Sequence, residues 1–241
     1  MNLDLLITIS SWITVVITTS LSIPQLIKLI RDKKTGNVNF ISFWIFHLGI
    51  MLWLVYGAFS TKENPYMLLN VIIADGISIF INGVMMYLLY HYKKEINLTK
   101  KLIAGGFIIL TWLVSIALIL IWSLSSTIRI TSQQALVFSL IAPSLTTFAF
   151  VPQLIQSIKT KNWKGVSHWM IFLFTINNIV WIVFWVGNII KVSNAGNPIY
   201  DLIGALIWQS ISLAIYSYQY VATLYYNNLD KKKLQKEEEM A

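Results

Sequence analysis

Seven long apolar runs constrain the fold of this chain more than any other feature of its sequence. A helix rises 1.5 Å per residue, so about 20 apolar residues are needed to cross the hydrocarbon core of a bilayer. The composition agrees, because 56% of the 241 residues are hydrophobic and only 12% are charged, too few for the surface of a soluble domain. The sequence therefore predicts an all-α membrane protein with seven transmembrane helices, near residues 5–30, 41–60, 65–91, 101–122, 133–158, 167–190 and 199–226.

The basic residues between the runs predict how the chain sits in the membrane. Of the 18 Lys and Arg residues, 15 lie in or beside the first, third and fifth loops or in the C-terminal tail, and three lie on the other side. Because cytoplasmic loops carry an excess of Lys and Arg, we expect an integral multi-pass protein of the cell membrane, with its N-terminus outside and its C-terminus cytoplasmic. The net charge of +8 is divided among short clusters, so the lipid bilayer and not nucleic acid is the expected partner.

Two parts of the chain repeat each other at a distance of 128 residues. The motif PQLI occurs at residues 24–27 and again at residues 152–155, and Trp53 meets Trp181 at the same offset. Each repeat holds three predicted spans and a single span joins them, so both repeats should cross the membrane in the same orientation, with the site between them. The expected units are a first three-helix repeat (1–92), a linker helix with its flanking loops (93–132), a second three-helix repeat (133–228) and a charged cytoplasmic tail (229–241).

This layout of three, one and three helices, with a Pro-Gln pair in the first helix of each repeat, resembles the PQ-loop family, whose members include the SWEET sugar transporters and their half-length bacterial relatives. The resemblance covers nearly the whole chain. The second repeat keeps the family-like sequence GVS at residues 165–167, whereas the first repeat has NVN at residues 37–39. The resemblance implies a transporter that moves a small polar solute by alternating access.

Two residues on neighbouring predicted helices are candidates for contact with that solute. Trp53 lies seven residues before Ser60 and Asn70 five residues after Pro65, so both are roughly 8–10 Å below the outer end of the first hairpin. An aromatic face and a carboxamide suit a sugar or another neutral hydroxylated solute, and in SWEET-like proteins a tryptophan and an asparagine at these positions line the substrate cavity. The alternative is that Trp53 belongs to an interfacial aromatic belt and that Asn70 bonds between helices.

The second repeat differs from the first at this site. It keeps the tryptophan, as Trp181, but has no asparagine at the position of Asn70. Asn177 lies one turn before Trp181 on the same helix face, while Asp201 and Gln209 flank the missing position. Because the second repeat lacks this asparagine, an amino acid or a vitamin is an alternative to a sugar as the solute. We therefore expect an asymmetric substrate-binding cavity lined by Trp53, Asn70, Asn177, Trp181 and Gln209.

Asp75 is the candidate that most affects the predicted chemistry. It lies ten residues after Pro65, about 15 Å deep and thus near the middle of the bilayer. Carboxyl groups at this depth are costly and mark functional sites. Ser78 and Asn82 follow at spacings of three and seven residues, which gives the helix one polar stripe. Asp75 is therefore a candidate for proton coupling or substrate contact, and it favours a proton-coupled or cationic solute. The alternative is a hydrogen-bonded structural aspartate.

Each Pro-Gln pair falls in the cytoplasmic third of the first helix of its repeat. Proline lacks an N–H group and its ring clashes with the preceding turn, so we expect breaks at Pro24 and Pro152. Gln25 and Gln153 are placed to recover the lost backbone bonds. These four residues are predicted hinges, which close the cytoplasmic side while the outer ends part. A fixed structural kink is the alternative. Pro143 adds a second expected break in the fifth span only.

The sequence offers no support for catalysis. It has no cysteine, and no glycine-rich phosphate loop, HExxH or GxSxG motif appears, so we expect no enzyme, no catalytic residue, no metal and no cofactor. His47 has no second ligand at metal spacing and is expected to be a hydrogen-bonded packing residue. The expected partner is a small-molecule solute, and the sequence is compatible with a homo-oligomer. The alternative function is a non-transporting receptor on the same seven-helix scaffold.

Overall fold

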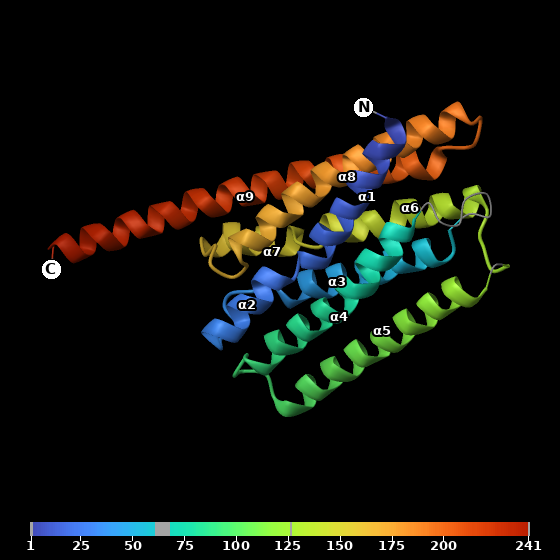
Figure 1. Ribbon diagram of the computed structural model, residues 1–241. Coiled ribbons are helices and arrows are strands. Elements are labelled where there is room, and N and C mark those ends of the chain that lie inside the picture. Colours follow the sequence, from blue (N-terminus) through green and yellow to red (C-terminus); the bar gives the residue numbers. More distant parts are fainter. Residues whose placement is uncertain (1, 61–67, 126, 241) are drawn as a thin grey trace.

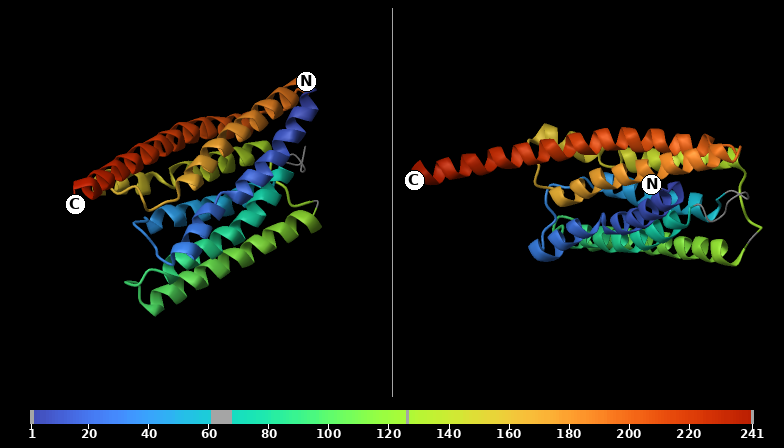
Figure 2. Two further views of the ribbon diagram at one scale, coloured as in Figure 1. Left: turned by 60° about the vertical axis from the view of Figure 1, so that its left-hand side comes forward. Right: turned by 45° about the horizontal axis from the view of Figure 1, so that its top comes forward.

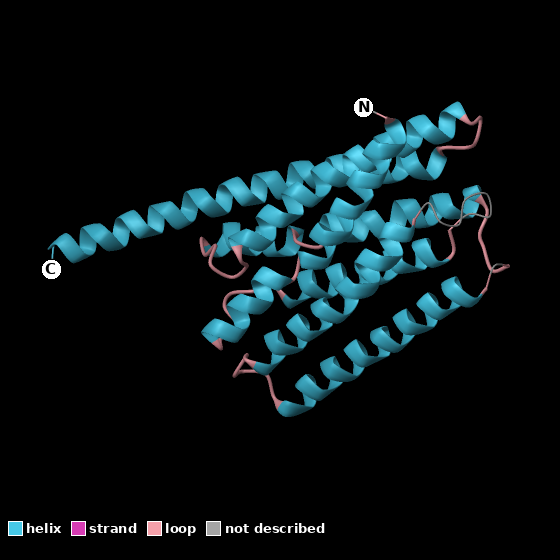
Figure 3. Cartoon of the chain, viewed as in Figure 1, coloured by secondary structure: helices cyan, strands magenta, loops and turns pink. Residues whose placement is uncertain are grey.

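The protein is a bundle of long helices (Figures 1 and 3), and the computed structural model describes residues 2–60, 68–125 and 127–240. The pair α1 and α2 forms one rod interrupted by a short turn, as does the pair α6 and α7, so the described helices make seven rods. The predicted start of the third span at Pro65 lies outside the described residues. The helices are α1 (Leu3–Ser20), α2 (Ile23–Asp32), α3 (Phe40–Ala58), α4 (Leu69–His91), α5 (Leu98–Leu124), α6 (Ser132–Phe148), α7 (Val151–Thr160), α8 (His168–Asn194) and α9 (Tyr200–Met240).

Six of the seven rods are long and apolar enough to cross a membrane, by length and composition. They are the rods formed by α1 with α2, by α6 with α7, and by α3, α4, α5 and α8, and they coincide with the first six predicted spans. The prediction of an all-helical, multi-pass protein is thus confirmed. α9 is not among these six candidates, and its sequence is more polar, with Asp201, Gln209 and Gln219 inside the predicted seventh span.

The first three and the last three rods pack in the same way. In the first triplet α4 contacts both α1 and α3, and in the second triplet α9 contacts both α6 and α8. Between the triplets α1 packs against α8 and α3 against α6, so the first rod of each triplet meets the second rod of the other. α5 lies on the outside of the bundle, against α3 and α4 (Figures 1 and 2). Two similar units around an axis along the rods would produce this reciprocal pattern.

The breaks in the two first rods repeat in local detail. Pro24 stands in the first turn of α2 and Pro152 in the first turn of α7, where the missing N–H group has no intrahelical partner to lose. Both short helices are followed by a lysine in the left-handed conformation, Lys33 with φ 48° and Lys161 with φ 53°. The predicted breaks at Pro24 and Pro152 are confirmed. The break expected at Pro143 is wrong, because α6 continues through this residue.

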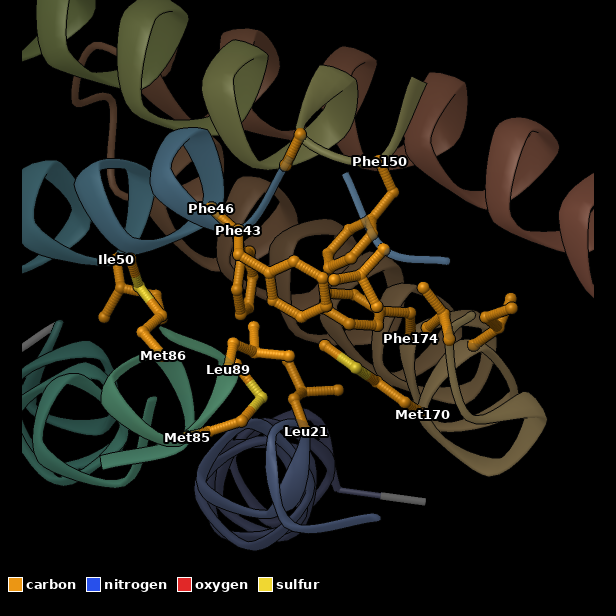
Figure 4. Close-up of a cluster of buried hydrophobic side chains, with 14 of the residues drawn as sticks. Leu21, Phe43, Phe46, Ile50, Met85, Met86, Leu89, Phe150, Met170 and Phe174 are labelled. Atoms are coloured by element: carbon orange, nitrogen blue, oxygen red, sulfur yellow. The ribbon is translucent and has the colours of Figure 1, made fainter. Parts of the chain in front are cut away.

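A cluster of buried aromatic and aliphatic side chains fills the space between the triplets (Figure 4). The ring of Phe150, from the turn between α6 and α7, lies with its centroid 5.8 Å from that of Phe46 on α3 and 5.4 Å from that of Phe174 on α8. The rings of Phe46 and Phe174 are 4.9 Å apart. Phe46 and Phe174 are related by the 128-residue offset, so the cluster forms where equivalent surfaces of the two triplets meet.

The packing of α5 against α4 depends on Gly83. A Cβ atom there would lie 2.8 Å from Cε2 of Trp112, nearer still to its Nε1, and 2.9 Å from Cγ2 of Ile108, whereas a Cβ atom on Gly106 would meet nothing within 4 Å. Gly106→Ala should raise the unfolding temperature, because alanine favours a helix by about 1 kcal/mol over glycine. Gly83→Ala should lower it, because overpacking costs roughly 1–3 kcal/mol and Trp112 stands to lose its hydrogen bond to the Ile79 carbonyl. Thermal unfolding in detergent compares the two variants; equal gains would contradict this packing.

Candidate functional site

A small cavity lies between the two triplets, near the middle of the rods. Its volume is about 40 Å³, well below the roughly 300–1,000 Å³ of pockets that hold small-molecule ligands. In this conformation the cavity is therefore closed around a space that suits only a few water molecules. Its described lining consists of Thr18, Leu21, Ser22, Phe46, Ile50, Trp53, Asp75, Ser78, Thr146, Phe174, Asn177, Asn178, Trp181, Gln209, Ser212 and Tyr216.

The structure does not bring Asn70 to this cavity. Its side chain is buried at the contact of α4 with α1, where Nδ2 donates to Thr14 Oγ1 at 3.0 Å and Oδ1 has no partner among the described residues. Asn70 lines a separate groove between α1, α4 and α8, and its part in solute binding stays a prediction. The predicted residues that the structure does bring together around the cavity are Trp53, Asp75, Asn177, Trp181 and Gln209.

Two tryptophans in the lining are held by hydrogen bonds across the interface between the triplets. Trp53 Nε1 donates to Thr146 Oγ1 at 3.3 Å, and Trp181 Nε1 donates to Thr18 Oγ1 at 3.1 Å. The two indole rings stack with centroids 6.2 Å apart. Sequence reasoning missed both threonines. A signal for them exists, because each lies six residues before the proline of its Pro-Gln pair.

Asn177 and Gly49 are one of the pairs of equivalent positions at which the two triplets differ. On α8, Asn177 accepts a hydrogen bond from Thr18 Oγ1 at 2.8 Å. The equivalent position on α3 is Gly49, where a Cβ atom would lie 2.6 Å from Thr146 Cγ2. Glycine lets α3 and α6 approach closely there, so at this position the second triplet contributes an amide to the lining and the first contributes no side chain.

Asp75 is the only Asp, Glu, Lys, Arg or His residue in the described lining of the cavity. Its side chain is 4% exposed. Among the described residues its carboxyl group has no hydrogen-bond or ion-pair partner, although Ser78, one turn further along α4, donates to the Thr18 carbonyl at 3.1 Å. The structure thus gives no support to the reading of Asp75 as a hydrogen-bonded structural residue.

His47 is a hydrogen-bonded packing residue, as the sequence predicts. Its Nδ1 lies 2.8 Å from Asn82 Oδ1, and its Nε2 lies 2.8 Å from Thr111 Oγ1 on α5. Asn82 Nδ2 in turn donates to Ser22 Oγ at 2.9 Å, and Ser22 directly precedes α2. This buried network joins α3, α4 and α5 to the turn at the first predicted hinge.

The oxygen atoms of the two Pro-Gln glutamines bond across the interface, although Gln153 Nε2 also donates to Ser157 Oγ within α7 at 3.3 Å. Gln25 Oε1 accepts the backbone N–H of Ser167 at 2.8 Å, and Gln153 Oε1 accepts that of Asn39 at 2.6 Å. Ser167 and Asn39 immediately precede α8 and α3, so each glutamine binds the start of the second rod in the other triplet. The expectation that they recover bonds lost at their own prolines is wrong, because the unpaired N–H groups at helix starts are their partners.

The loops at residues 33–39 and 161–167 meet at one end of the bundle, which we call the basic end. Lys28 Nζ donates to the carbonyls of Lys164 and Gly165, and Gln156 Nε2 donates to Asn37 Oδ1 at 2.6 Å. Gly165 approaches the backbone of Asn37 so closely that a Cβ atom would overlap the carbonyl group. The two loops therefore close the basic end by direct contact between the triplets.

At the opposite end a buried hydrogen bond joins the triplets. The Tyr56 hydroxyl, in the last turns of α3, donates to Asp201 Oδ2 at 2.7 Å, in the first turn of α9. Both side chains are buried. Sequence reasoning noted Asp201 beside the site but did not find Tyr56 as its partner, because the two are 145 residues apart. The cavity is thus closed at both ends.

Comparisons with known proteins agree with the internal repeat. The PQ loop repeat matches this chain twice, at residues 6–66 and 135–192. An uncharacterized protein of Methanocaldococcus jannaschii is 34% identical over 71 residues, 30% of this chain and 75% of that protein. The sugar transporter SemiSWEET of Escherichia coli is 43% identical over 49 residues, 20% of this chain and 55% of the transporter. The SemiSWEET of Leptospira biflexa is 25% identical over 76 residues, 32% of this chain and 82% of the transporter.

Proposed function

Because this chain belongs to the PQ-loop repeat family, we propose that it is a membrane transporter that moves a small polar solute through the central cavity by alternating access. One observation carries the proposal: the polar contacts that close the cavity at each end join one repeat to the other. Either end can therefore open by movement of one repeat against the other, without unfolding of either. The turns before Pro24 and Pro152 are the proposed hinges, and Gln25 and Gln153 make the contacts that these hinges release.

The lining of the cavity supports a solute with both apolar and hydrogen-bonding groups. Trp53 and Trp181 provide aromatic surface, and Asn177 and Gln209 provide amides. The relatives from E. coli and L. biflexa are sugar transporters, which supports a sugar or another neutral hydroxylated solute, with an amino acid or a vitamin as alternatives. Asp75 serves in this proposal as a contact for the solute or for a coupled proton.

The proposed transporter has seven spans, with α9 as the last. α5 links two parallel three-helix repeats, residues 1–92 and 133–228. The positive-inside pattern supports a cytoplasmic basic end, so that the N-terminus faces outwards and the C-terminal part of α9 extends into the cytoplasm. The Lys164–Asp230 ion pair, with Nζ and Oδ2 3.2 Å apart, supports the same side for α9 and the loop at residues 161–167.

Uptake into proteoliposomes tests this function. Radiolabelled glucose, sucrose, amino acids and vitamins should include at least one solute that enters faster than into empty liposomes. Trp181→Phe should slow that uptake about five- to tenfold, because it removes a hydrogen bond between the repeats. Trp169→Phe is the matched control, since this tryptophan is exposed outside the cavity. Binding of a solute without uptake would instead identify a non-transporting receptor.

A further inference from the structure

We propose that the solute held in the central cavity is a small organic cation, bound through its ammonium group to the carboxyl group of Asp75. The inference rests on the proposed function, since it names the chemical class that the transporter carries. It separates this chain from its relatives among sugar transporters by the charge of the solute.

The first argument is the unbalanced charge of the cavity. Asp75 is 4% exposed and faces the cavity, and no described residue of the lining is Lys, Arg or His. An unpaired carboxylate near the middle of a membrane is costly. A cation that enters the cavity offsets this cost, an anion increases it, and a neutral solute leaves it as it was. The lining therefore favours cations over neutral solutes of the same shape.

The second argument is the aromatic surface of the cavity that Asp75 lines. Aromatic rings attract cations through their faces, and rings grouped around a small space are a recurrent site for ammonium groups. The indoles are held in place by their hydrogen bonds to the threonines of the opposite repeat. The described rings of the lining belong to Phe46, Trp53, Phe174, Trp181 and Tyr216.

The third argument is the polar wall contributed by the second repeat. Gln209 and Ser212 on α9 line the same cavity, and among the described residues their side chains have no hydrogen-bond partner. An amide and a hydroxyl suit a hydroxyl or carbonyl group of the solute. A solute with an ammonium group at Asp75 and a polar group at α9 would bridge the two repeats, which links its binding to closure of the cavity.

The experiment compares solutes that differ only in charge. Glucosamine, with its amine protonated, is paired with glucose, and choline is paired with its uncharged isostere 3,3-dimethylbutan-1-ol. Binding by thermal shift and uptake into proteoliposomes are measured for wild type, Asp75→Asn and Asp75→Glu. The wild type should bind at least one cation about tenfold or more tightly than its neutral partner. Asp75→Asn should abolish this preference and Asp75→Glu should retain it. Asp4→Asn is the control, because Asp4 is an exposed aspartate paired with Lys191.

Each outcome bears on one of the two proposals. Equal binding of the charged and neutral partners by wild type overturns the inference, even if the Asp75→Asn variant fails to fold. A preference for cations that persists in Asp75→Asn also overturns the inference. Proton-driven uptake of glucose that is lost in Asp75→Asn overturns it too, because Asp75 would then bind the coupled proton and not the solute. Uptake of neutral solutes alone would support the transport function and overturn the inference of a cationic solute. Binding of cations without uptake would support the inference of a cationic ligand and overturn the transport function.

Discussion

Replacing Gly165 with alanine is expected to open the basic end of the protein. A Cβ atom at this position would lie 2.7 Å from the carbonyl carbon of Asn37 and nearer still to its oxygen. Both of these are backbone atoms, so no side chain can rotate to make room. Overpacking costs roughly 1–3 kcal/mol, and such a difference shifts the ratio of closed to open states about 5- to 150-fold.

A single introduced cysteine can report this opening. The chain has no native cysteine, so no other thiol competes for a reagent. Ser212 lines the cavity, and its hydroxyl has no partner among the described residues, which makes Ser212→Cys a mild change. In membrane vesicles of known orientation, a membrane-impermeant thiol reagent on the basic side should label this reporter at least fivefold faster when Gly165→Ala is also present.

Gly36 provides the matched control for the same loop contact. A Cβ atom on Gly36 would lie 3.7 Å from the Cα atom of Gly165, an ordinary contact distance. Gly36→Ala should therefore leave the labelling rate of Ser212→Cys unchanged from the basic side. The same acceleration in both variants would show that loss of any glycine loosens the loops, and would remove the steric explanation.

Much of the fold could be predicted because it depends on local chemistry. The length of an apolar run determines whether it can cross a bilayer, and a proline in the first turn determines where α2 and α7 begin. The repeat then predicts that both helices are followed by the same turn, at Lys33 and Lys161. The end of α9 was harder to predict, because the charged residues 229–241 suggested a solvated tail and not a continuation of the helix. Lys, Glu and Gln are strong helix formers, and α9 continues to Met240.

The contacts between the repeats could not be predicted in the same way. The 128-residue offset makes Gln25 equivalent to Gln153 and Asn39 equivalent to Ser167, but it does not show that each glutamine meets the serine or asparagine of the other repeat. Such a pairing depends on how the two triplets pack. No local pattern in the sequence encodes it, so the glutamines were assigned to their own helices.

The position of Asn70 shows a second limit of sequence reasoning. Counting residues along a helix gives depth, and at this depth Asn70 matches Trp53. Depth does not give direction around the helix axis. Asn70 and Asp75 are five residues apart on α4, which places them about 140° apart around it. With Asp75 towards the cavity, Asn70 is directed elsewhere, and the structure has it bonded to Thr14 on α1.

Replacing Tyr56 with phenylalanine is expected to open the opposite end. The substitution keeps the ring and removes the hydroxyl that donates to Asp201 Oδ2 at 2.7 Å. Loss of a buried hydrogen bond to a carboxyl group costs roughly 1–3 kcal/mol, so the ratio of closed to open states should fall about 5- to 150-fold. The Ser212→Cys reporter should then be labelled faster from the side opposite to the basic end. Tyr90→Phe is the control, because the Tyr90 hydroxyl accepts a hydrogen bond from Trp44 inside the first repeat.

The combination of Tyr56→Phe with Gly165→Ala tests whether the two ends are coupled. In alternating access the open states at the two ends exclude each other, so a change that favours one must reduce the other. Tyr56→Phe should therefore slow labelling from the basic side, Gly165→Ala should slow it from the opposite side, and the two shifts should partly cancel in the double variant. Two independent ends would instead give faster labelling from both sides at once. That result would describe a channel, and it would exclude the hinged movement proposed for Pro24 and Pro152.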